Sequence, residues 1–575
     1  MTTPPPTDAI LDRPPRLPGL AVVLLVAVVF APGVDGEFVW DDQVGLVESW
    51  GYRRPAAEAV RFAFTTTALG HWQPLTWLSF SLDHAIWGLE ALGFRCTNLL
   101  VHAAASLAVM AMASELLRRA HPTATVVART WGAGLAAALF AIHPLRVESV
   151  CWAIERRDLL SCAGLAASVW AYLVADRSPR PGRWRALSLA CFALSLLSKA
   201  WGVSLVAVLV AIDLYPARRQ TWRRLLAAKL PYVALAIPVA ILARHAQHSA
   251  GAMADWTRYP LERRVAQAVY GIAFYPWKTV LPTSLSPLYE LEGAHAATWA
   301  GRHAAAGAFA LVVTFTAIAV WRRTRAPLVA WVSYLALVSP VLGFFQSGMQ
   351  EVADRYAIVA TIPFAVLVAG GAIGLAARGV RTRRAVVATS VLAVGALGAL
   401  AAQYVPHWRD ERALWSRVLE IQPTSWMAHH GLGLVLHRDG DNRRALRLLE
   451  RAAALGDHVE CYAALGMVRL RTGAARAAAA DLDRALAIDP RHAPARYHRA
   501  LARRAYGDRD GELEDLARAT ELAPEAWKPW GAYGRALAEA GRIEPANAAF
   551  DRALEVAPDV ARPGLVQQRA ESLRR

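Results

Sequence analysis

Residues 17–43 read LPGLAVVLLVAVVFAPGVDGEFVWDDQ, an apolar run that is followed by two adjacent carboxylates, Asp41 and Asp42. The run has the composition of a membrane helix. Acidic side chains are costly close to lipid and are not needed to hold a helix there. We therefore interpret the rest of the chain as building a membrane-embedded site around this pair. Taken alone, the stretch is more simply explained as a solvated loop with chance acids.

Residues 1–16 precede this run and are rich in proline, so we expect a disordered tail. A cleaved signal peptide is the alternative interpretation of the first apolar run, because Ala31-Pro32-Gly33 offers small residues at its end. We prefer an uncleaved anchor, since further apolar runs follow along the chain.

The composition indicates a membrane protein with a soluble part. Of the 575 residues, 55% are hydrophobic and 19% are charged, which is too apolar for an ordinary soluble protein. The formal net charge is +17, but the arginines cluster in short loops between apolar runs, as in cytoplasmic membrane loops. We therefore expect membrane lipid, and no nucleic acid, among the partners. The five cysteines lack metal-ligand spacing and predict no disulfide framework.

Eleven apolar runs are each near the ~20 residues that cross a bilayer. Arginine-rich loops alternate with arginine-poor ones, which places the N-terminus inside, the Asp41-Asp42 loop outside, and everything after about residue 403 outside. The predicted spans are residues 17–33, 97–117, 131–149, 159–176, 186–199, 201–216, 230–246, 303–321, 327–345, 356–377 and 385–403.

The segment 265–282 is also long enough to span, but a span there would put the basic loop 322–325 outside. We interpret it as a re-entrant or interfacial element, because Trp277 and Lys278 are typical of a membrane interface. The outer loop 34–96 is rich in aromatic residues, so we expect amphipathic helices that lie in the interface plane.

From residue 411 the composition changes and a period emerges. Pro490, Pro524 and Pro558 are spaced by 34 residues, and small and large residues recur between them. Small residues let paired helices approach, large ones fill the gap and proline stops the second helix, which is the tetratricopeptide pattern. Residues 411–575 therefore predict about four repeats whose concave surface binds a peptide or protein. The unit that ends at Pro524 fits least well, and a generic alanine-rich bundle is the alternative.

Several charged residues lie at the predicted outer ends of the spans, where polar residues are functional candidates. An enzyme that transfers a group from a lipid-linked phosphate donor would need charged residues of this kind. Lysine and arginine hold phosphate, and a carboxylate takes a proton from an acceptor hydroxyl or holds a divalent metal. Lys199 and Arg355 are the candidates for the phosphate, and Asp41 and Asp42 for the base or for Mg²⁺ or Mn²⁺. The residues expected to support the site are His143, Glu148, Arg157, Asp158 and Tyr356.

Structural explanations exist for the same residues. Lys199 is of the type that snorkels at an interface. Glu148 and Asp158 could simply pair with Arg146 and Arg157.

Two further pairs have equally simple explanations. Asp354 and Arg355 could form an ion pair within one loop. Asn98 and His102, four residues apart on one helix face, are more typical of hydrogen bonds between helices than of ligands.

The order of these motifs resembles a known family, the transmembrane and tetratricopeptide-repeat-containing proteins of the GT-C class of membrane glycosyltransferases. The resemblance implies a GT-C-like domain over residues 17–405, then the repeats. It implies transfer of a sugar, typically mannose, from a polyprenyl-phosphate carrier to a protein hydroxyl on the lumenal or periplasmic side, with Asp41 or Asp42 as the catalytic acid. The motifs are Asp41-Asp42, Pro74-Leu75-Thr76 before Leu78-Ser79-Phe80, Gly93-Phe94 with Asn98 and His102, His143-Pro144 with Glu148, Asp158-Leu159-Leu160, Lys199 with Gly202, and Arg355-Tyr356.

Three positions depart from the family pattern. Gln73 stands where the family often has arginine, and Ala200 and Asp354 stand where it often has glutamate. The change at Ala200 removes a charge beside Lys199 and bears on the identity of the donor.

We expect an all-α chain, a polytopic membrane bundle of about eleven spans followed by a tetratricopeptide α-solenoid. The predicted function is that of an inverting glycosyltransferase that moves mannose or another hexose from a polyprenyl phosphate to an acceptor protein or peptide presented by the repeats. The alternatives are a membrane-anchored repeat scaffold without catalysis and a transferase of lipid-linked oligosaccharide. The arginine- and alanine-rich composition is typical of bacteria, so we expect the inner membrane, with the repeats in the periplasm.

Overall fold

The computed structural model describes residues 17–215, 221–251, 259–291, 299–344, 348–558 and 560–574. The expected disordered tail, residues 1–16, lies outside this part of the chain. The described chain is almost entirely helical and divides into two compact units, Met1–Arg417 and Val418–Arg575.

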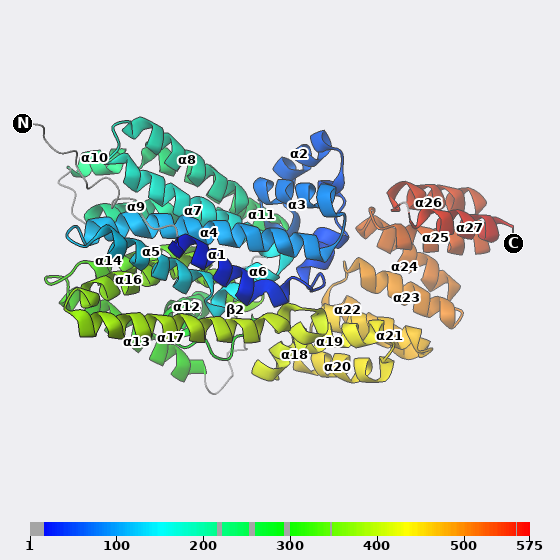
Figure 1. Cartoon of the computed structure of the whole chain (residues 1–575). Coiled ribbons are helices and arrows are strands. Elements are labelled where there is room, and N and C mark those ends of the chain that lie inside the picture. The colour runs from blue at the N-terminus through cyan, green and yellow to red at the C-terminus, as the bar shows by residue number, and fades with distance from the viewer. Residues whose placement is uncertain are drawn as a thin grey trace, which may run out of the picture. The chain divides into compact units, whose positions relative to one another are not determined.

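The first unit is a bundle of long apolar helices (Figure 1). Five helices of the described chain are long and apolar enough to cross a membrane, and two bent helix pairs bring the number to seven. The chain is therefore an integral, multi-pass membrane protein. Three shorter apolar helices, Leu17–Gly33, Ala200–Leu214 and Ala326–Val341, accompany them.

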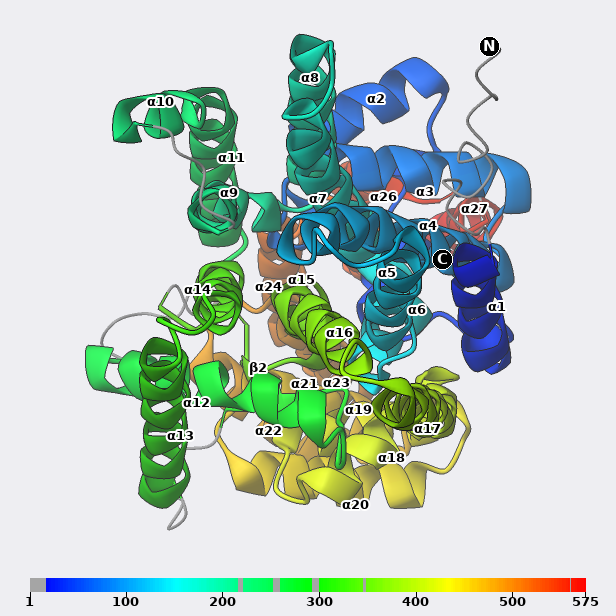
Figure 2. The same ribbon diagram turned by 60° about the vertical axis from the view of Figure 1, so that its left-hand side comes forward.

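Each of the predicted spans falls on a helix, and Figure 2 shows two of them, α9 and α17, nearly end-on. The total of eleven spans stays a prediction. The helices are α1 (Leu17–Phe30), α4 (Ala91–Ala120), α5 (Val126–Ala141), α7 (Arg156–Ala175), α8 (Pro181–Ser198), α9 (Leu205–Leu214), α11 (Leu230–Ser249), α13 (Trp299–Ala319), α14 (Ala326–Val338), α16 (Ile362–Ala376) and α17 (Val380–Tyr404).

Helices α7 and α8 pack closely through small residues. A Cβ on Gly164 would lie 2.8 Å from backbone atoms of Cys191 and Ser195 on α8. The hydroxyls of Ser161 and Ser195 are 3.0 Å apart. In lipid, small residues let helices approach and bond to one another. The C-terminal end of α8 is thereby held beside the N-terminal end of α7, where the candidate site begins.

Two spans are broken near their charged residues. Helix α5 is followed by the turn Pro144–Arg146 and α6 (Val147–Cys151), with a bend of 61°. The turn Asp354–Tyr356 and α15 (Ala357–Ala360) precede α16, with a bend of 54°. Proline occupies the first turn after each break. It starts a helix readily but cannot continue one, because it lacks the backbone N–H.

The outer loop contains two helices, α2 (Ala56–Thr65) and α3 (Pro74–Trp87). Both expose apolar side chains, such as Phe64 on α2 and Ile86 on α3. Their placement in an interface plane stays a prediction.

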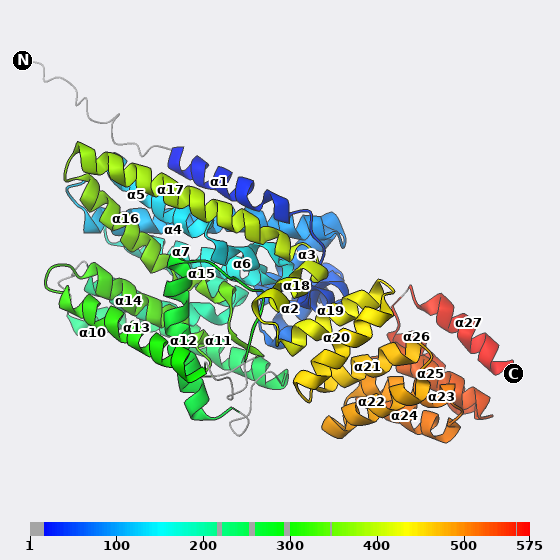
Figure 3. The same cartoon turned by 90° about the horizontal axis from the view of Figure 1, so that it is seen from below.

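The segment 265–282 lies mostly on α12 (Leu261–Val280), a helix that is not among those long and apolar enough to span in the described chain. Figure 3 shows α12 running across the direction of α13 and α14. Next to the all-α bundle, two short strands, β1 (Tyr289–Glu290) and β2 (Gln350–Val352), pair antiparallel. Tyr289 opposes Val352 in this small sheet.

The second unit consists of helix pairs that follow the predicted repeats. The first helices of three pairs begin at Val459, Ala493 and Trp527, which are 34 residues apart. A Cβ on Gly433 or Gly534 would lie 2.9 Å from the large residue of the second helix, so glycine lets the two helices touch. The pairs are α19 (Trp426–Arg438) with α20 (Asn442–Leu455), α21 (Val459–Arg471) with α22 (Ala475–Ile488), α23 (Ala493–Ala505) with α24 (Arg509–Leu522), and α25 (Trp527–Glu539) with α26 (Ile543–Val556), followed by α27 (Arg562–Leu573).

The pair α23–α24 fits the pattern least well because its interior is charged. Asp515 of α24 is fully buried. It accepts from Arg499 at 2.6 and 2.7 Å and contacts Arg496 and Arg503 at 3.4 and 3.1 Å. Arg496 and Arg499 occupy positions where the pairs α21–α22 and α25–α26 have large apolar residues, so ion pairs with Asp515 add to the apolar packing of Ala500 and Leu516 here.

Candidate functional site

Asp41 and Asp42 follow a residue with an unusual backbone conformation. Trp40 has a φ of +54°, which non-glycine residues adopt rarely and at a cost. Its ring stacks on Trp152, with centroids 5.0 Å apart and planes at 13°, and lies 5.1 Å from the ring of Trp415. A helical turn begins directly after it with Asp41 and Asp42, so the two adjacent acids point in different directions and meet different neighbours.

Asp42 is fully buried and binds backbone N–H groups. Its carboxylate accepts from Val39 N at 3.1 Å and from Ile154 N at 2.8 Å. Burial raises the pKa of Asp42 to about 7, against the opposing effect of these hydrogen bonds. Asp42 therefore joins the outer loop to the turn before α7, which is a structural role.

Asp41 faces the charged residues of the site. Its side chain is partly exposed and makes no hydrogen bond or ion pair among the described residues. Burial raises the pKa of Asp41, whereas the charges of Arg157 and Arg355 lower it and that of Glu155 raises it. Of the two predicted acids, the geometry favours Asp41 as the one that could act on a substrate.

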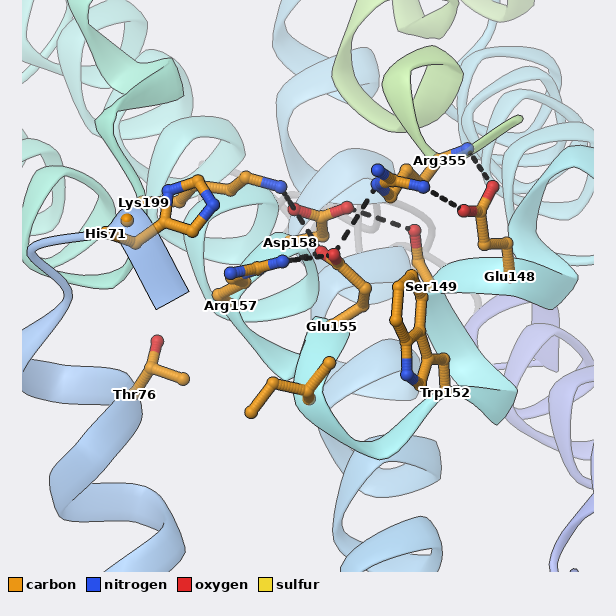
Figure 4. Close-up of polar contacts among 12 residues, drawn as sticks. His71, Thr76, Glu148, Ser149, Trp152, Glu155, Arg157, Asp158, Lys199 and Arg355 are labelled. Atoms are coloured by element: carbon orange, nitrogen blue, oxygen red, sulfur yellow. Dashed lines mark hydrogen bonds and ion pairs between the residues drawn. The ribbon is translucent and has the colours of Figure 1, made fainter. Parts of the chain in front are cut away.

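Glu155 lies at the centre of a buried cluster of cations, which Figure 4 shows in close-up. Its carboxylate accepts from Arg157 Nε at 3.0 Å and from Lys199 Nζ at 3.2 Å, and Arg355 Nε lies 3.5 Å away. The three cations come from α7, the end of α8 and the turn before α15. Lys199 is only 7% exposed, so it does not snorkel toward water.

Two further acids bind the same cations. Asp158 pairs with Lys199 rather than with Arg157. Glu148 pairs with the Arg355 guanidinium and also accepts from the Arg355 backbone N–H at 2.8 Å. Buried charges are tolerated when each is paired in this way, and the pairs hold the cations in place.

The alternative pairings considered from the sequence do not form. Arg146 donates to Thr361 Oγ1 at 2.5 Å and lies over the Phe140 ring at 4.9 Å, away from any pairing with Glu148. Asp354 accepts from the Tyr289 hydroxyl at 2.9 Å instead of pairing within its own loop.

Asn98 and His102 bond between elements, as expected from their helical spacing. The Asn98 amide donates to Trp152 O at 3.1 Å and accepts from Arg156 Nε at 2.8 Å. His102 Nε2 lies 2.7 Å from Ala141 O. Both residues are structural.

His143 and Tyr356 both make hydrogen bonds outside the cation cluster, and their support of the site stays a prediction. His143 Nδ1 accepts from Leu145 N at 3.2 Å, and its Nε2 lies 3.0 Å from Thr279 O. The Tyr356 hydroxyl accepts from Gln350 at 2.8 Å. Because both ring nitrogens of His143 are engaged, its role is to shape the break after α5.

The cluster has an unused hydrogen-bond donor. Arg157 is only 5% exposed, yet its Nη1 has no hydrogen-bond partner in the described part of the chain. A buried unpaired donor is costly. An anionic ligand beside Arg157, such as a phosphate, would satisfy it.

Two residues of the site were missed by the sequence prediction. Glu155 stands in the charged run Glu155-Arg156-Arg157-Asp158, and nothing local marks it as the central acid. His71 interacts electrostatically with Arg157 and Lys199, and Figure 4 shows its ring beside Lys199. The only signal for His71 in the sequence was its place just before the Pro74-Leu75-Thr76 motif.

Asp41 and Asp42 stay the residues predicted to hold a metal ion. Both oxygens of Asp42 already accept backbone N–H groups. In the described residues, no group of three or more His, Cys, Asp or Glu is arranged to hold an ion. Involvement of Mg²⁺ or Mn²⁺ stays a prediction, and the steps proposed below are assigned to side chains.

An apolar cavity of about 600 Å³ lies among α4, α7, α9, α14 and α16. Leu165, two turns beyond Asp158 on α7, and Val359, one turn beyond Arg355, line it. His121 and Arg378 also line it. The cavity therefore starts within about two helical turns of the cation cluster.

Curated proteins with a related sequence are protein O-mannosyl-transferases. Tmtc1 of Drosophila melanogaster is 29% identical over 205 residues, which are 34% of this chain and 20% of that protein. Human TMTC4 is 28% identical over 227 residues, 35% of this chain and 30% of that protein. No family model matches. The chain is distantly homologous to these transferases and spans less than a third of the length of each.

Solved structures that are similar to part of this chain include MamA and TTC0263, the second described as a thermophilic tetratricopeptide-repeat protein. MamA is 24% identical, with a TM-score of 0.23, and covers 25% of this chain and 84% of its own. TTC0263 of Thermus thermophilus is 25% identical, with a TM-score of 0.25, over 28% of this chain and 88% of its own. These scores are too low to support an argument of their own.

Proposed function

We propose that the chain is a membrane glycosyltransferase that moves a hexose, mannose first among the candidates, from a polyprenyl phosphate to a protein hydroxyl. The observation that carries this proposal is the buried cluster of Arg157, Lys199 and Arg355 beside the carboxylate of Asp41. The distant homology to protein O-mannosyl-transferases supports the same class of reaction.

In the proposed reaction the acceptor hydroxyl oxygen attacks the anomeric carbon of the sugar while the bond from that carbon to the phosphate oxygen breaks. The proton of the acceptor passes to Asp41, and the bonding electrons leave with the polyprenyl phosphate. Attack from the side opposite the leaving group inverts the anomeric configuration. A positioned base of this kind contributes about 10²–10⁴-fold to a rate.

The cation cluster would stabilise the negative charge on the leaving phosphate. Arg157 has an unpaired Nη1, and Glu155 holds Arg157, Lys199 and Arg355 together before any substrate binds. Cations that are already in place need no reorganisation as the charge develops. Glu155 is therefore assigned a positioning role.

The apolar cavity would take part of the polyprenyl chain. Its lining begins near Asp158 and Arg355 and continues along α7 and α16 to Gly374 and Arg378. Burial of apolar chain supplies binding energy of roughly 0.8 kcal/mol per CH₂ group. With its phosphate at the cation cluster and its polyprenyl chain in the cavity, the donor would have both its charged part and its apolar part bound.

The orientation follows from the arginine-rich loops. With about eleven spans and a cytoplasmic N-terminus, the Asp41 loop and the repeats lie on the extracytoplasmic side. The repeats would bind the acceptor protein there, because stacked helix pairs offer a concave peptide-binding surface. The composition favours a bacterial inner membrane, with transfer in the periplasm.

The test is transfer of labelled mannose from polyprenyl-phosphate mannose to an acceptor peptide by the full-length protein in lipid nanodiscs. Asp41→Asn should lower kcat by at least about 10²-fold. Asp35→Asn changes an exposed acid of the same loop and should retain activity. If Asp41→Asn transfers mannose as fast as the wild type, Asp41 is not the catalytic base.

The identity of the lipid that is consumed separates the other functions. Release of a polyprenyl monophosphate with transfer of one hexose supports the proposal. Consumption of a lipid-linked oligosaccharide would point to the oligosaccharide transferase. Peptide binding without transfer of either sugar would point to the scaffold.

A further inference from the structure

The turn before α3 carries a histidine that the proposed reaction does not use. In the turn Ala68–Gly70, Leu69 has a φ of +57° and Gly70 a φ of +71°. A positive φ at a non-glycine residue costs free energy and persists only where the surrounding structure enforces it. His71 follows this turn in an extended conformation and is partly buried.

Gln247 of α11 holds the turn and the imidazole. Its Nε2 donates to the Gly70 carbonyl oxygen at 2.6 Å and lies 3.5 Å from His71 Nδ1. A carbonyl oxygen can only accept, so Gly70 decides which end of the Gln247 amide carries the hydrogens. The NH₂ group of Gln247 therefore also faces His71 Nδ1, and Nδ1 accepts a hydrogen bond from it. In the neutral ring the proton therefore sits on Nε2.

His71 faces the cations of the candidate site. Burial lowers the pKa of His71 well below its usual value, and the charges of Arg157, Lys199 and Arg355 lower it further, while Glu155 opposes them. The imidazole is neutral as a result, and Nε2–H has no partner among the described residues. It offers a hydrogen bond beside three cations without adding a fourth charge to a buried site.

We propose that His71 Nε2–H donates to a non-bridging phosphate oxygen of the lipid-linked donor, between Lys199 and Arg157, and that Gln247 is a positioning residue that sets the tautomer of His71. This inference rests on the proposed function, because it places the donor phosphate at the same cluster. Lys199 and Arg157 attract that phosphate through their positive charges, and the hydrogen bond from His71 fixes its orientation.

Binding of a polyprenyl monophosphate to the full-length protein in detergent tests the contact. His71→Ala should weaken binding by about ten- to a hundredfold, the worth of one hydrogen bond to a charged group. His71→Gln places an amide N–H near the position of Nε2 and should bind within about threefold of the wild type. His248→Gln, an exposed position next to Gln247, is the matched control and should bind as the wild type does.

Gln247→Met tests the positioning role, because it keeps the size of the side chain and removes the amide. It should weaken binding in the wild type, where the imidazole can then place its proton on either nitrogen. In the His71→Gln background the loss should be clearly smaller, because only the hydrogen bond to the Gly70 carbonyl oxygen is then removed. Equal losses in both backgrounds would mean that Gln247 acts only by holding the turn, which overturns the tautomer assignment.

Two results would overturn the phosphate contact. One is equal binding of the monophosphate by the wild type and His71→Ala. The other is a loss seen only with the sugar-bearing donor, which would place His71 at the sugar. A protein that binds the monophosphate through His71 but transfers no hexose would refute the proposed function and leave this contact standing. Polyprenol without phosphate should bind the wild type and His71→Ala equally.

Discussion

Arg355 and Glu148, 207 residues apart in sequence, form a buried ion pair in which the Arg355 backbone N–H also donates to the carboxylate at 2.8 Å. Each residue lies on the short helical segment of a bent span, Glu148 in Pro144–Cys151 and Arg355 in Asp354–Ala360. The pair therefore joins the two breaks and fixes one of the cations of the candidate site.

Glu148→Gln should destabilise the membrane unit strongly. It leaves the guanidinium of Arg355 buried with only part of its compensating charge, and breaking a buried pair costs about 3–5 kcal/mol. Thermal unfolding in detergent measures the effect. Glu58→Gln removes the exposed pair with Arg54, worth less than about 1 kcal/mol. Equal shifts for Glu148→Gln and Glu58→Gln would contradict a stabilising role of the buried pair.

Trp40→Ala should lower the transfer rate more than it lowers stability. The stack of Trp40 on Trp152 holds the positive φ that directs Asp41 toward Arg157. Loss of this ring stack costs about 0.5–1.5 kcal/mol in addition to the lost burial of apolar surface. The backbone next to Asp41 is then free to take other conformations. Kinetics of mannose transfer and melting temperature are compared. Trp50→Ala, 54% exposed in the same loop, is the control. Unchanged kcat in Trp40→Ala would show that Asp41 needs no such support.

Asp42 should make stability depend on pH. Burial raises its pKa from 3.8 to about 7 in the folded protein. The folded state then holds the proton more tightly than the unfolded chain. The stability that Asp42 contributes is complete below about pH 4 and is lost as the pH rises through about 7. The melting temperature of the wild type relative to Asp42→Asn should fall over this range and then level off. A constant difference would rule out this titration.

Asp515→Ala should loosen the pair α23–α24. Arg496, Arg499 and Arg503 would lose their shared buried acid, at about 3–5 kcal/mol. Hydrogen exchange of the full-length protein should show lost protection in these two helices. Asp483→Ala removes only a largely exposed partner of Arg499 and serves as the control. If protection in α23–α24 survives Asp515→Ala, the charged interior is not what holds this pair.

Gly374→Phe should shorten the apolar cavity at the end away from the cation cluster. Gly374 lines the cavity, and a Cβ at this position would have His121 as its nearest neighbour outside the helix, at 3.8 Å, so a larger side chain can enter the space. The KM for a long-chain donor should rise, while a short-chain donor should be unaffected. Gly395→Phe on α17, where no neighbour lies within 4 Å, is the control. Equal KM changes for both donors would place the chain elsewhere.

The helices of both units were largely predictable from the sequence. Apolar runs near the length of a span and the 34-residue steps of Pro490, Pro524 and Pro558 are local or periodic signals, and each run coincides with a helix. The weak unit before Pro524 was also visible, and it contains the fully buried Asp515. Such signals persist because burial and helix geometry act on neighbouring residues.

The partners within the site were not predictable. Each acid had a plausible neighbour in sequence, yet Glu148 pairs with Arg355, and Asp158 with Lys199. The central acid, Glu155, had no distinguishing local pattern. Ion pairs between distant segments depend on how helices pack and where spans bend, which periodicity does not record.

The sequence by itself determined that this chain is helical, lies in a membrane, ends in repeats and concentrates its charged motifs near the ends of a few spans. Only the tertiary structure decided which partners Asp41 and Asp42 meet. Asp42 accepts hydrogen bonds from the backbone N–H groups of Val39 and Ile154, whereas Asp41 makes none among the described residues and is acted on by the charges of Arg157 and Arg355. Neighbouring residues of a helical turn point in different directions, and only the packing of this loop against the turn before α7 decides that Asp42 is the one that meets Ile154 N.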